Sequence, residues 1–194
     1  MARTKVAGQP TERVRQAVLN CTRDLLDEAG FSKLSVEAIA ERSGVSKATI
    51  YRWWPNRAAV AMDTLLEVAG PNQAILHEGS ALSNLRTHVR IAGEFIGGKT
   101  GGTLAGLVAD LQHDPELAEA FRTRYLAERR GMTCEVIARA IEEGDLDAEL
   151  DPGFVVDLLI GPLYYRLLLG HDDVDPDVAE RVLDRLLDGL RKVG

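Results

Sequence analysis

Apolar residues recur at helical spacing along the whole chain after residue 11, and no run alternates apolar and polar side chains between hairpin turns. This pattern predicts helices and no sheet. Helix starts are marked by three Asp-Pro pairs, at residues 114–115, 151–152 and 175–176. In each pair the carboxylate caps free backbone N–H groups, and proline suits the first helical position because its missing N–H has no partner there.

Glycines such as Gly30, Gly144 and Gly170 follow these periodic segments, as expected of helix ends. The expected fold class is therefore all-α, with about nine helices. Their predicted ranges are 11–29, 36–42, 47–53, 57–69, 82–96, 103–113, 115–143, 152–169 and 176–192.

Residues 93–100 read GEFIGGKT, which matches the phosphate-binding loop of nucleotide hydrolases. That loop requires a strand before it and a helix after it, so that backbone N–H groups converge on a phosphate. Here residues 82–96 form an expected helix, and we interpret the stretch as a helix end that runs into a Gly-rich turn. A P-loop nucleotide hydrolase is an alternative function that a phosphate-release assay can exclude.

Charge is distributed unevenly along the sequence. The net charge is −7, which on its own argues against a nucleic-acid binder. Residues 1–60, however, contain ten Lys or Arg against six Asp or Glu, whereas the remaining 134 residues contain 13 against 24. A basic head on an acidic body predicts that the head approaches a polyanion.

Several classes of protein find no support in the sequence. Cys21 and Cys134 have no partner pattern, so we expect neither a disulfide framework nor zinc, and a cytoplasmic location. No stretch approaches the roughly 18 apolar residues of a membrane span. The four histidines are dispersed, and no serine or cysteine has a visible base partner. We therefore predict no metal, no cofactor, no membrane partner and no enzyme activity.

Residues 35–57, SVEAIAERSGVSKATIYRWWPNR, predict a helix-turn-helix. Ser35 and Ser46 are the expected N-caps of two short helices. Gly44 between them can adopt the positive φ that reverses the chain. The second helix, residues 47–53, presents basic and aromatic side chains that can donate to phosphates or base edges.

This segment resembles the DNA-binding domain of the TetR family of bacterial transcriptional regulators. The resemblance rests on AIAERSGVSKATIYRWWPNRAAV, preceded by a long first helix and GFSKLSVE, and it covers residues 11–66. In the family the run ends in tyrosine, any residue, two aromatics, proline, a small polar residue and a basic one, as residues 51–57 do here. The resemblance implies an all-α fold with a three-helix DNA-binding head, residues 1–56, and a larger effector-binding and dimerisation body, residues 57–194.

The resemblance also implies roles for individual residues of the head. Trp54 is expected to pack in its small core, with Phe31, Leu34 and Ile39. Arg3 and Lys5 form either an arm beside the DNA or a basic tail without contacts. The predicted DNA-binding residues are Ser35, Ser46, Lys47, Ala48, Thr49, Tyr51, Arg52, Trp53 and Arg57, the last on a phosphate.

The end of the body, DLLIGPLYYRLLLG, resembles one TetR subgroup, in which the last two helices pack against those of a second subunit. Residues 152–169 are apolar around nearly the full helix, so they are expected to cover two surfaces. The predicted dimer contacts are Phe154, Leu158, Tyr165, Val178, Val182, Leu186 and Leu190.

The resemblance further implies an effector pocket between the helices of the body. The candidate lining residues are Phe95, Leu107, Leu111, Phe121, Arg122, Tyr125, Met132, Tyr164 and Arg166. A purely structural role in the core is the competing interpretation for each. The glycines at 97, 98, 101 and 102 suggest a helix end that moves when a ligand enters.

Taken together, these features predict a ligand-responsive transcriptional regulator, with repression as the expected mode. It would bind a palindromic double-stranded DNA operator as a homodimer and be released by a small-molecule effector. The alternative is an all-helical, small-molecule-binding dimer without DNA binding. The exposed basic face on residues 47–57 argues against that alternative.

Overall fold

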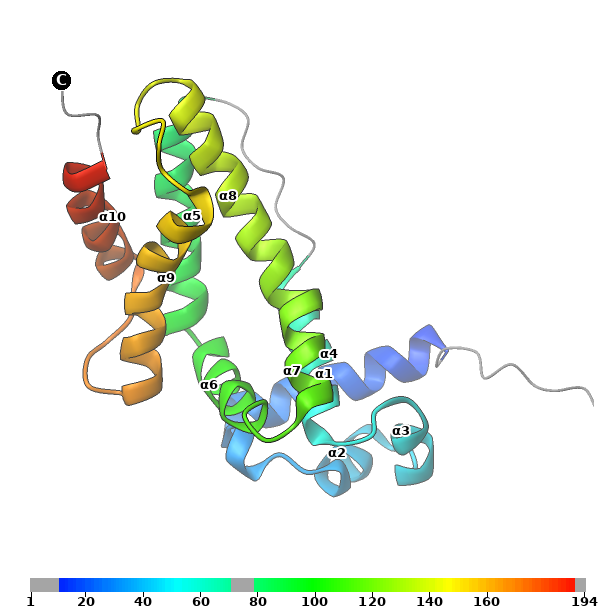
Figure 1. The fold of residues 1–194 in the computed structure, drawn as a ribbon. Coiled ribbons are helices and arrows are strands. Elements are labelled where there is room, and N and C mark those ends of the chain that lie inside the picture. Colours follow the sequence, from blue (N-terminus) through cyan, green and yellow to red (C-terminus); the bar gives the residue numbers. More distant parts are fainter. Residues whose placement is uncertain (1–10, 71–78, 191–194) are drawn as a thin grey trace, which may run out of the picture. The chain divides into compact units, whose positions relative to one another are not determined.

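A computed structural model describes residues 11–70 and 79–190 of the 194-residue chain. Throughout these residues the regular structure is helical, as predicted (Figure 1). The chain divides into two compact units, which meet between Val68 and Ala69. We refer to residues up to 68 as the head and to residues from 69 onward as the body, and describe each by itself.

Residues 11–68 of the head form four helices and one short 3-10 turn, Phe31–Lys33. Their ranges agree with the predicted ones to within a residue at each end. Its core is formed by apolar side chains from every helix, including Leu19, Ile39, Ile50 and Leu65, all nearly inaccessible to solvent. The helices are α1 (Glu12–Ala29), α2 (Val36–Ser43), α3 (Lys47–Trp53) and α4 (Arg57–Ala69).

Helix α4 packs with the head almost to its end, whereas the sequence suggests a boundary after residue 56. Its buried residues include Val60, Met62 and Leu65. Near its end, Glu67 accepts hydrogen bonds from Arg15 at 3.2 Å and from Gln16 at 2.7 Å, both on α1. The head therefore needs α4 to complete its core, and the division lies just before the last residue of this helix.

The body begins with α5 (Ala81–Gly97) and α6 (Thr100–Asp110). A long helix then runs from residue 115 to 142, and it includes a π-helical segment, Phe121–Leu126, between α7 (Pro115–Ala120) and α8 (Ala127–Glu142). The predicted helix 115–143 is thus present, but its wider π turn had no signal in the sequence. The last two helices are α9 (Pro152–Leu169) and α10 (Pro176–Leu190).

The three Asp-Pro starts form as predicted. Asp114 accepts a hydrogen bond from the Leu117 N–H at 3.0 Å. Asp151 accepts from the Gly153 N–H at 2.9 Å, and Asp175 accepts from the Val178 N–H at 2.7 Å. Each carboxylate thereby satisfies one of the free donors at its helix start.

The body is organised around α5, which packs against α8, α9 and α10 (Figure 1). The crossing of α5 with the start of α10 is very close. A Cβ added at Gly93 would lie 2.7 Å from the Asp175 carbonyl oxygen and 2.9 Å from the Ala179 Cβ, and one added at Gly97 would overlap the Val174 carbonyl. The fold requires glycine at both positions.

This crossing explains GEFIGGKT. Helix α5 continues through Gly97 and α6 begins at Thr100, so a helix, not a strand, precedes the glycines, as predicted. Gly98 and Gly101 would meet backbone oxygens of Glu94 and Ile96 if they carried a Cβ. The glycines suggested as a moving helix end thus serve close packing, apart from Gly102, which has open space around it.

Candidate nucleic-acid interface and ligand cavity

The helix-turn-helix is formed by α2, α3 and the turn that joins them. The Ser35 Oγ accepts a hydrogen bond from the Ala38 N–H at 3.1 Å, and the Ser46 Oγ accepts one from the Thr49 N–H at 3.2 Å. Gly44 has a φ of +69°, in the left-handed region. Both predicted caps and the predicted turn residue are therefore confirmed.

The outward face of α3 presents several of the predicted DNA-binding side chains to solvent. Tyr51 is 49% exposed. The Lys47 Nζ lies 3.2 Å from the Glu37 carboxylate, in an exposed ion pair. The Arg52 side chain makes no ion pair or hydrogen bond with residues 11–70 or 79–190. Ser46, Lys47, Ala48, Tyr51 and Arg52 are exposed, whereas Ser35, Thr49 and Trp53 are half-buried.

The ion pair between Lys47 and Glu37 is of a kind that another acceptor can replace. Two hydrogen bonds, one from its own backbone and one from Lys47, hold the pKa of Glu37 below its ordinary value. Glu37 therefore stays ionised at neutral pH and competes with any phosphate or base for the lysine. An exposed pair of this kind contributes little stability, so a DNA acceptor can replace the carboxylate.

Arg57 does not project as the resemblance implies. Its Nη1 donates to the carbonyl oxygens of Phe31, Ser32 and Leu34 at 3.2 to 3.4 Å. The guanidinium also lies over the Phe31 ring, 4.8 Å from its centroid. These contacts engage the side chain within the head, so its placement indicates a structural role in place of the predicted phosphate contact.

The Trp54 side chain is buried within the head. Its side chain is only 3% exposed, and its Nε1 donates to the Asp63 carboxylate at 2.9 Å. Phe31, Leu34 and Ile39 are buried as well. The predicted core position of Trp54 is confirmed, while Arg3 and Lys5 lie outside the described residues.

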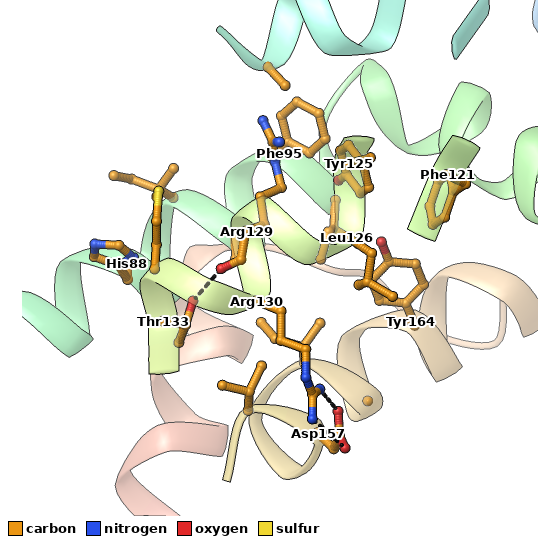
Figure 2. A pocket seen from close by; sticks show the side chains of 18 of the residues that line it. His88, Phe95, Phe121, Tyr125, Leu126, Arg129, Arg130, Thr133, Asp157 and Tyr164 are labelled. Carbon is orange, nitrogen blue, oxygen red and sulfur yellow. Dashed lines mark hydrogen bonds and ion pairs between the residues drawn. The ribbon is translucent and has the colours of Figure 1, made fainter. Parts of the chain in front are cut away.

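A cavity of about 660 Å³ lies within the body, between α5, α6, the π segment, α8 and α9 (Figure 2). This volume is within the range of small-molecule sites. Seven of the nine predicted lining residues are on its wall: Phe95, Leu111, Phe121, Arg122, Tyr125, Met132 and Tyr164.

Two predicted lining residues are elsewhere. Leu107 is fully buried in the packing of α6. Arg166 donates to the Asp173 carbonyl at 2.8 Å and pairs with Asp172 at 2.9 Å, so it closes the turn after α9. Helical periodicity predicts whether a residue lies on the apolar or the polar side of its helix. It does not predict which neighbouring helix that side contacts.

Polar residues of the wall that were not predicted from the sequence include His88, Arg129 and Arg130. The two arginines lie side by side in the polar stretch AERRG. The available signal was the spacing of Phe121, Tyr125 and Arg129, which are four residues apart and therefore share one helix face.

Aromatic rings and one guanidinium form the most tightly organised part of the wall. The ring centroids of Phe121 and Tyr125 are 4.9 Å apart, and those of Phe95 and Tyr125 are 6.3 Å apart. The Arg129 guanidinium lies 4.5 Å from the Tyr125 ring centroid and 5.8 Å from that of Phe95 (Figure 2). Both distances are within cation–π range.

Burial sets the protonation of the other polar groups. Desolvation raises the pKa of Tyr125 and of Tyr164, so both hydroxyls remain protonated and neutral. Desolvation also lowers the pKa of His88 below its ordinary value, so its imidazole is neutral at pH 7. Arg130 donates to Asp157, and its positive charge balances that of the Asp157 carboxylate. Arg130 also donates to the Gly153 carbonyl.

A separate apolar surface lies on α9. Phe154 is 59% exposed and Tyr165 is 60% exposed, with Leu158 half-buried. This helix is long and apolar enough to cross a membrane by length and composition alone, with a mean hydropathy of 1.3, although the sequence analysis found no such stretch. Little of it is buried within the body, so an apolar face is left uncovered.

Helix α10 contributes less to this surface than predicted. Val178 is 4% exposed, because it faces the core of its own body, and it is therefore not available as a dimer contact. Val182 and Leu186 are half-buried. The side chain of Leu190 lies outside the described residues.

Comparison with known proteins relates both units to one family. "Tetracyclin repressor-like, C-terminal domain" matches residues 75–186, more than half of the chain, and "Bacterial regulatory proteins, tetR family" matches residues 18–62. The chain is 36% identical to YdeS, an uncharacterised helix-turn-helix transcriptional regulator of Bacillus subtilis, over 95% of this chain and 93% of that protein.

Solved structures show the same architecture. The TetR family transcription regulator SCO0332 superimposes with a TM-score of 0.75 at 33% identity, over 93% of this chain and all of the other. FadR of Bacillus subtilis, in complex with stearoyl-CoA, has a TM-score of 0.70 at 18% identity, over 91% of this chain and 99% of the other. The chain therefore belongs to the TetR family, and it is a DNA-binding helix-turn-helix transcriptional regulator, not an enzyme.

Proposed function

We propose that this regulator represses transcription by binding a palindromic operator as a homodimer, and that a small molecule bound in the body cavity releases it. The observation that carries the proposal is the combination of two sites in one chain. The head has an exposed, capped recognition helix, and the body has an apolar cavity large enough for a small molecule.

The head supports the DNA-binding part of the proposal. Lys47 and Arg52 supply donors at the two ends of α3, and Tyr51 adds an exposed hydroxyl between them. Helices of this kind enter the major groove and donate to base edges and phosphates. Arg57 supports this face indirectly, since it ties the start of α4 to the segment that leads into α2.

The apolar face of α9 supports the homodimer. Phe154, Leu158 and Tyr165 would lie in the interface, with Val182 and Leu186 of α10 beside them. A second copy is a suitable cover, because a symmetric contact pairs the same patch on both subunits. Two heads held in this way would reach successive major grooves, about one helical turn (~34 Å) apart.

The cavity supports effector control. FadR of Bacillus subtilis has a related fold and was solved with stearoyl-CoA, a small-molecule ligand. An effector that prefers a body conformation unsuited to the operator shifts the population away from DNA. The coupling is reciprocal, so the operator weakens effector binding by the same factor.

The proposal is tested by selecting bound duplexes from a random DNA pool with the purified protein at near-physiological salt. Enrichment of an inverted repeat is expected, and its half-site spacing would report the separation of the two heads. Failure to enrich any sequence, with a folded dimer, would favour a ligand-binding dimer that does not read DNA.

The oligomeric state is tested separately by sedimentation of the wild type and of Tyr165→Glu. The wild type is expected to be a dimer. The variant is expected to dissociate, because it places a charge in the apolar face of α9. A monomeric wild type that still enriches an inverted repeat would contradict the dimer through this face.

A further inference from the structure

We propose that the effector is an amphipathic carboxylate, whose apolar chain fills the cavity and whose carboxylate binds the Arg129 guanidinium. This inference rests on the proposed function, since it assigns a ligand class to the cavity of the body. It follows from which charged groups of the wall already have a partner of opposite charge.

Arg129 is the arginine of the wall whose charge is not balanced. Among the described residues it pairs with no carboxylate, and its guanidinium lies over the rings of Tyr125 and Phe95. The guanidinium is also part of the cavity wall. Its planar fork of N–H donors suits a carboxylate, which accepts two parallel hydrogen bonds.

The other two arginines of the wall already have partners. Arg122 pairs with Glu119 at 2.7 Å, on the outer surface. Arg130 pairs with Asp157, a carboxylate of the wall (Figure 2), and also donates to the Gly153 carbonyl. Among the residues that the structure describes, the wall thus has three arginines against one aspartate, and its unbalanced positive charge is that of Arg129.

The same contacts argue against a cationic ligand. Aromatic rings such as Phe95 and Tyr125 often hold quaternary ammonium groups. Here Arg129 already occupies that position, so a second cation would meet both a filled site and a like charge. An anion is attracted by the same arrangement.

Two tyrosines of the wall, Tyr125 and Tyr164, supply further donors, since each phenol carries one O–H group. Both hydroxyls stay protonated because burial raises their pKa. Among the described residues of the wall, a carboxylate near Arg129 would therefore meet donors, while the carboxylate of Asp157 is paired with Arg130.

The remainder of the wall suits an apolar chain. Its side chains include Ile91, Val108, Met132, Val156 and Ile160, which offer no fixed hydrogen-bonding group. A ligand that is polar throughout would lose its hydration here without replacement. The chemistry of the wall thus calls for one anionic end and an apolar body.

The test uses three ligands that share a chain length and differ in their head group: dodecanoate, dodecanol and dodecyltrimethylammonium. Binding to the full-length protein is measured by titration calorimetry at pH 7. We expect dodecanoate to bind at least tenfold more tightly than dodecanol, and the ammonium compound to bind most weakly. Equal affinities for dodecanoate and dodecanol would overturn the proposal.

Two substitutions test the role of Arg129. Arg129→Met is expected to weaken dodecanoate binding at least tenfold and to leave dodecanol binding nearly unchanged, which also verifies that the cavity is intact. Arg129→Lys, which keeps the charge but not the fork, is expected to fall between. The matched control, Arg124→Met, replaces an exposed arginine of the π segment that does not line the cavity, and it should behave as the wild type. An Arg129→Met variant with an unchanged preference for dodecanoate would contradict the anchor.

Failure of this inference is distinguishable from failure of the proposed function. If a neutral or cationic compound binds and releases the selected operator while dodecanoate does not bind, the ligand class is wrong and the proposed regulation stands. If dodecanoate binds as expected but leaves the operator complex unaffected, the ligand class is supported and the proposed release mechanism is contradicted.

Discussion

The head and the body use their polar side chains in opposite ways. In the head, α3 presents Lys47, Tyr51 and Arg52 outward from a small apolar core. In the body, the cavity turns Arg129 and the Tyr125–Tyr164 pair inward, among apolar side chains. A surface that meets DNA and a pocket that encloses a small molecule thus place their recognition groups on different sides of their cores.

This difference affects how each site is built. The face of α3 depends on one short helix, two serine caps and a turn glycine, all within residues 35–53. The cavity depends on five helical segments, whose lining residues lie between Thr87 and Tyr164. A local motif tolerates change elsewhere in the chain, whereas the cavity depends on how distant helices cross.

The largest expected effect is on the helix crossing that shapes the body. Gly97→Ala places a Cβ against the Val174 carbonyl. We expect it to destabilise the body by about 3 kcal/mol, because backbone must move to relieve the overlap. Urea unfolding measures the change.

Gly102→Ala is the matched control, since it lies in α6 with open space around its Cβ position. It is expected to be neutral or to stabilise by about 0.5–1 kcal/mol, as alanine is the better helix former. Equal effects of the two substitutions would show that the crossing is not tight. The body would then tolerate substitution as well as the head does.

The second effect concerns Arg57 and separates its structural role from a DNA contact. Arg57→Ala is expected to lower the free energy of unfolding of the head by about 2 kcal/mol, because three carbonyls lose a charged donor. The salt dependence of operator binding should stay unchanged in the folded variant. A slope reduced by about one unit, with unchanged stability, would instead restore the phosphate contact.

The third effect concerns base reading by α3. Lys47→Ala is expected to weaken binding to the selected operator by about 1–2 kcal/mol and to change the preferred bases in each half-site. Repeating the DNA selection with the variant measures both. Lys33→Ala, at an exposed lysine before α2, is the control. Equal losses on every sequence with Lys47→Ala would remove its base-reading role.

The smallest effect is a pH dependence in the body. Desolvation lowers the pKa of His88 from its ordinary value of 6.5, so the unfolded chain binds a proton more readily than the folded one. The stability of the wild type should therefore fall as the pH decreases from about 7 through 6.5, and more steeply than that of His88→Gln. Parallel urea titrations at several pH values test this, and identical slopes would contradict it.

The fold was largely predictable from local signals. Asp114, Asp151 and Asp175 marked helix starts, and each carboxylate caps its helix in the structure. The serine caps and the turn at Gly44 were equally predictable from the sequence, because capping and positive φ are properties of a few neighbouring residues. The π turn at Phe121–Leu126 left no such mark, since it depends on the packing around it.

The candidate sites were predictable to different degrees for the same reason. The exposed residues of α3 follow from one helix and its periodicity. The cavity required knowledge of which faces meet, so Leu107 and Arg166 were assigned to it wrongly, and Arg129 was overlooked. Val178 and Arg57 show the same limit, because both are engaged by neighbours distant in sequence.

By itself, the sequence determined the helical class, the Asp-Pro helix starts and the helix-turn-helix, because hydrophobic period, caps and turn glycines act over a few residues. The helix predicted at residues 103–113 lies at Thr100–Asp110 in the structure. Only the tertiary structure decided that α4 completes the head, that Gly93 and Gly97 permit the crossing of α5 and α10, and that Arg129 faces a cavity. These outcomes depend on the packing of segments far apart in the chain, where side-chain volume and close contact select among faces that the sequence leaves equivalent.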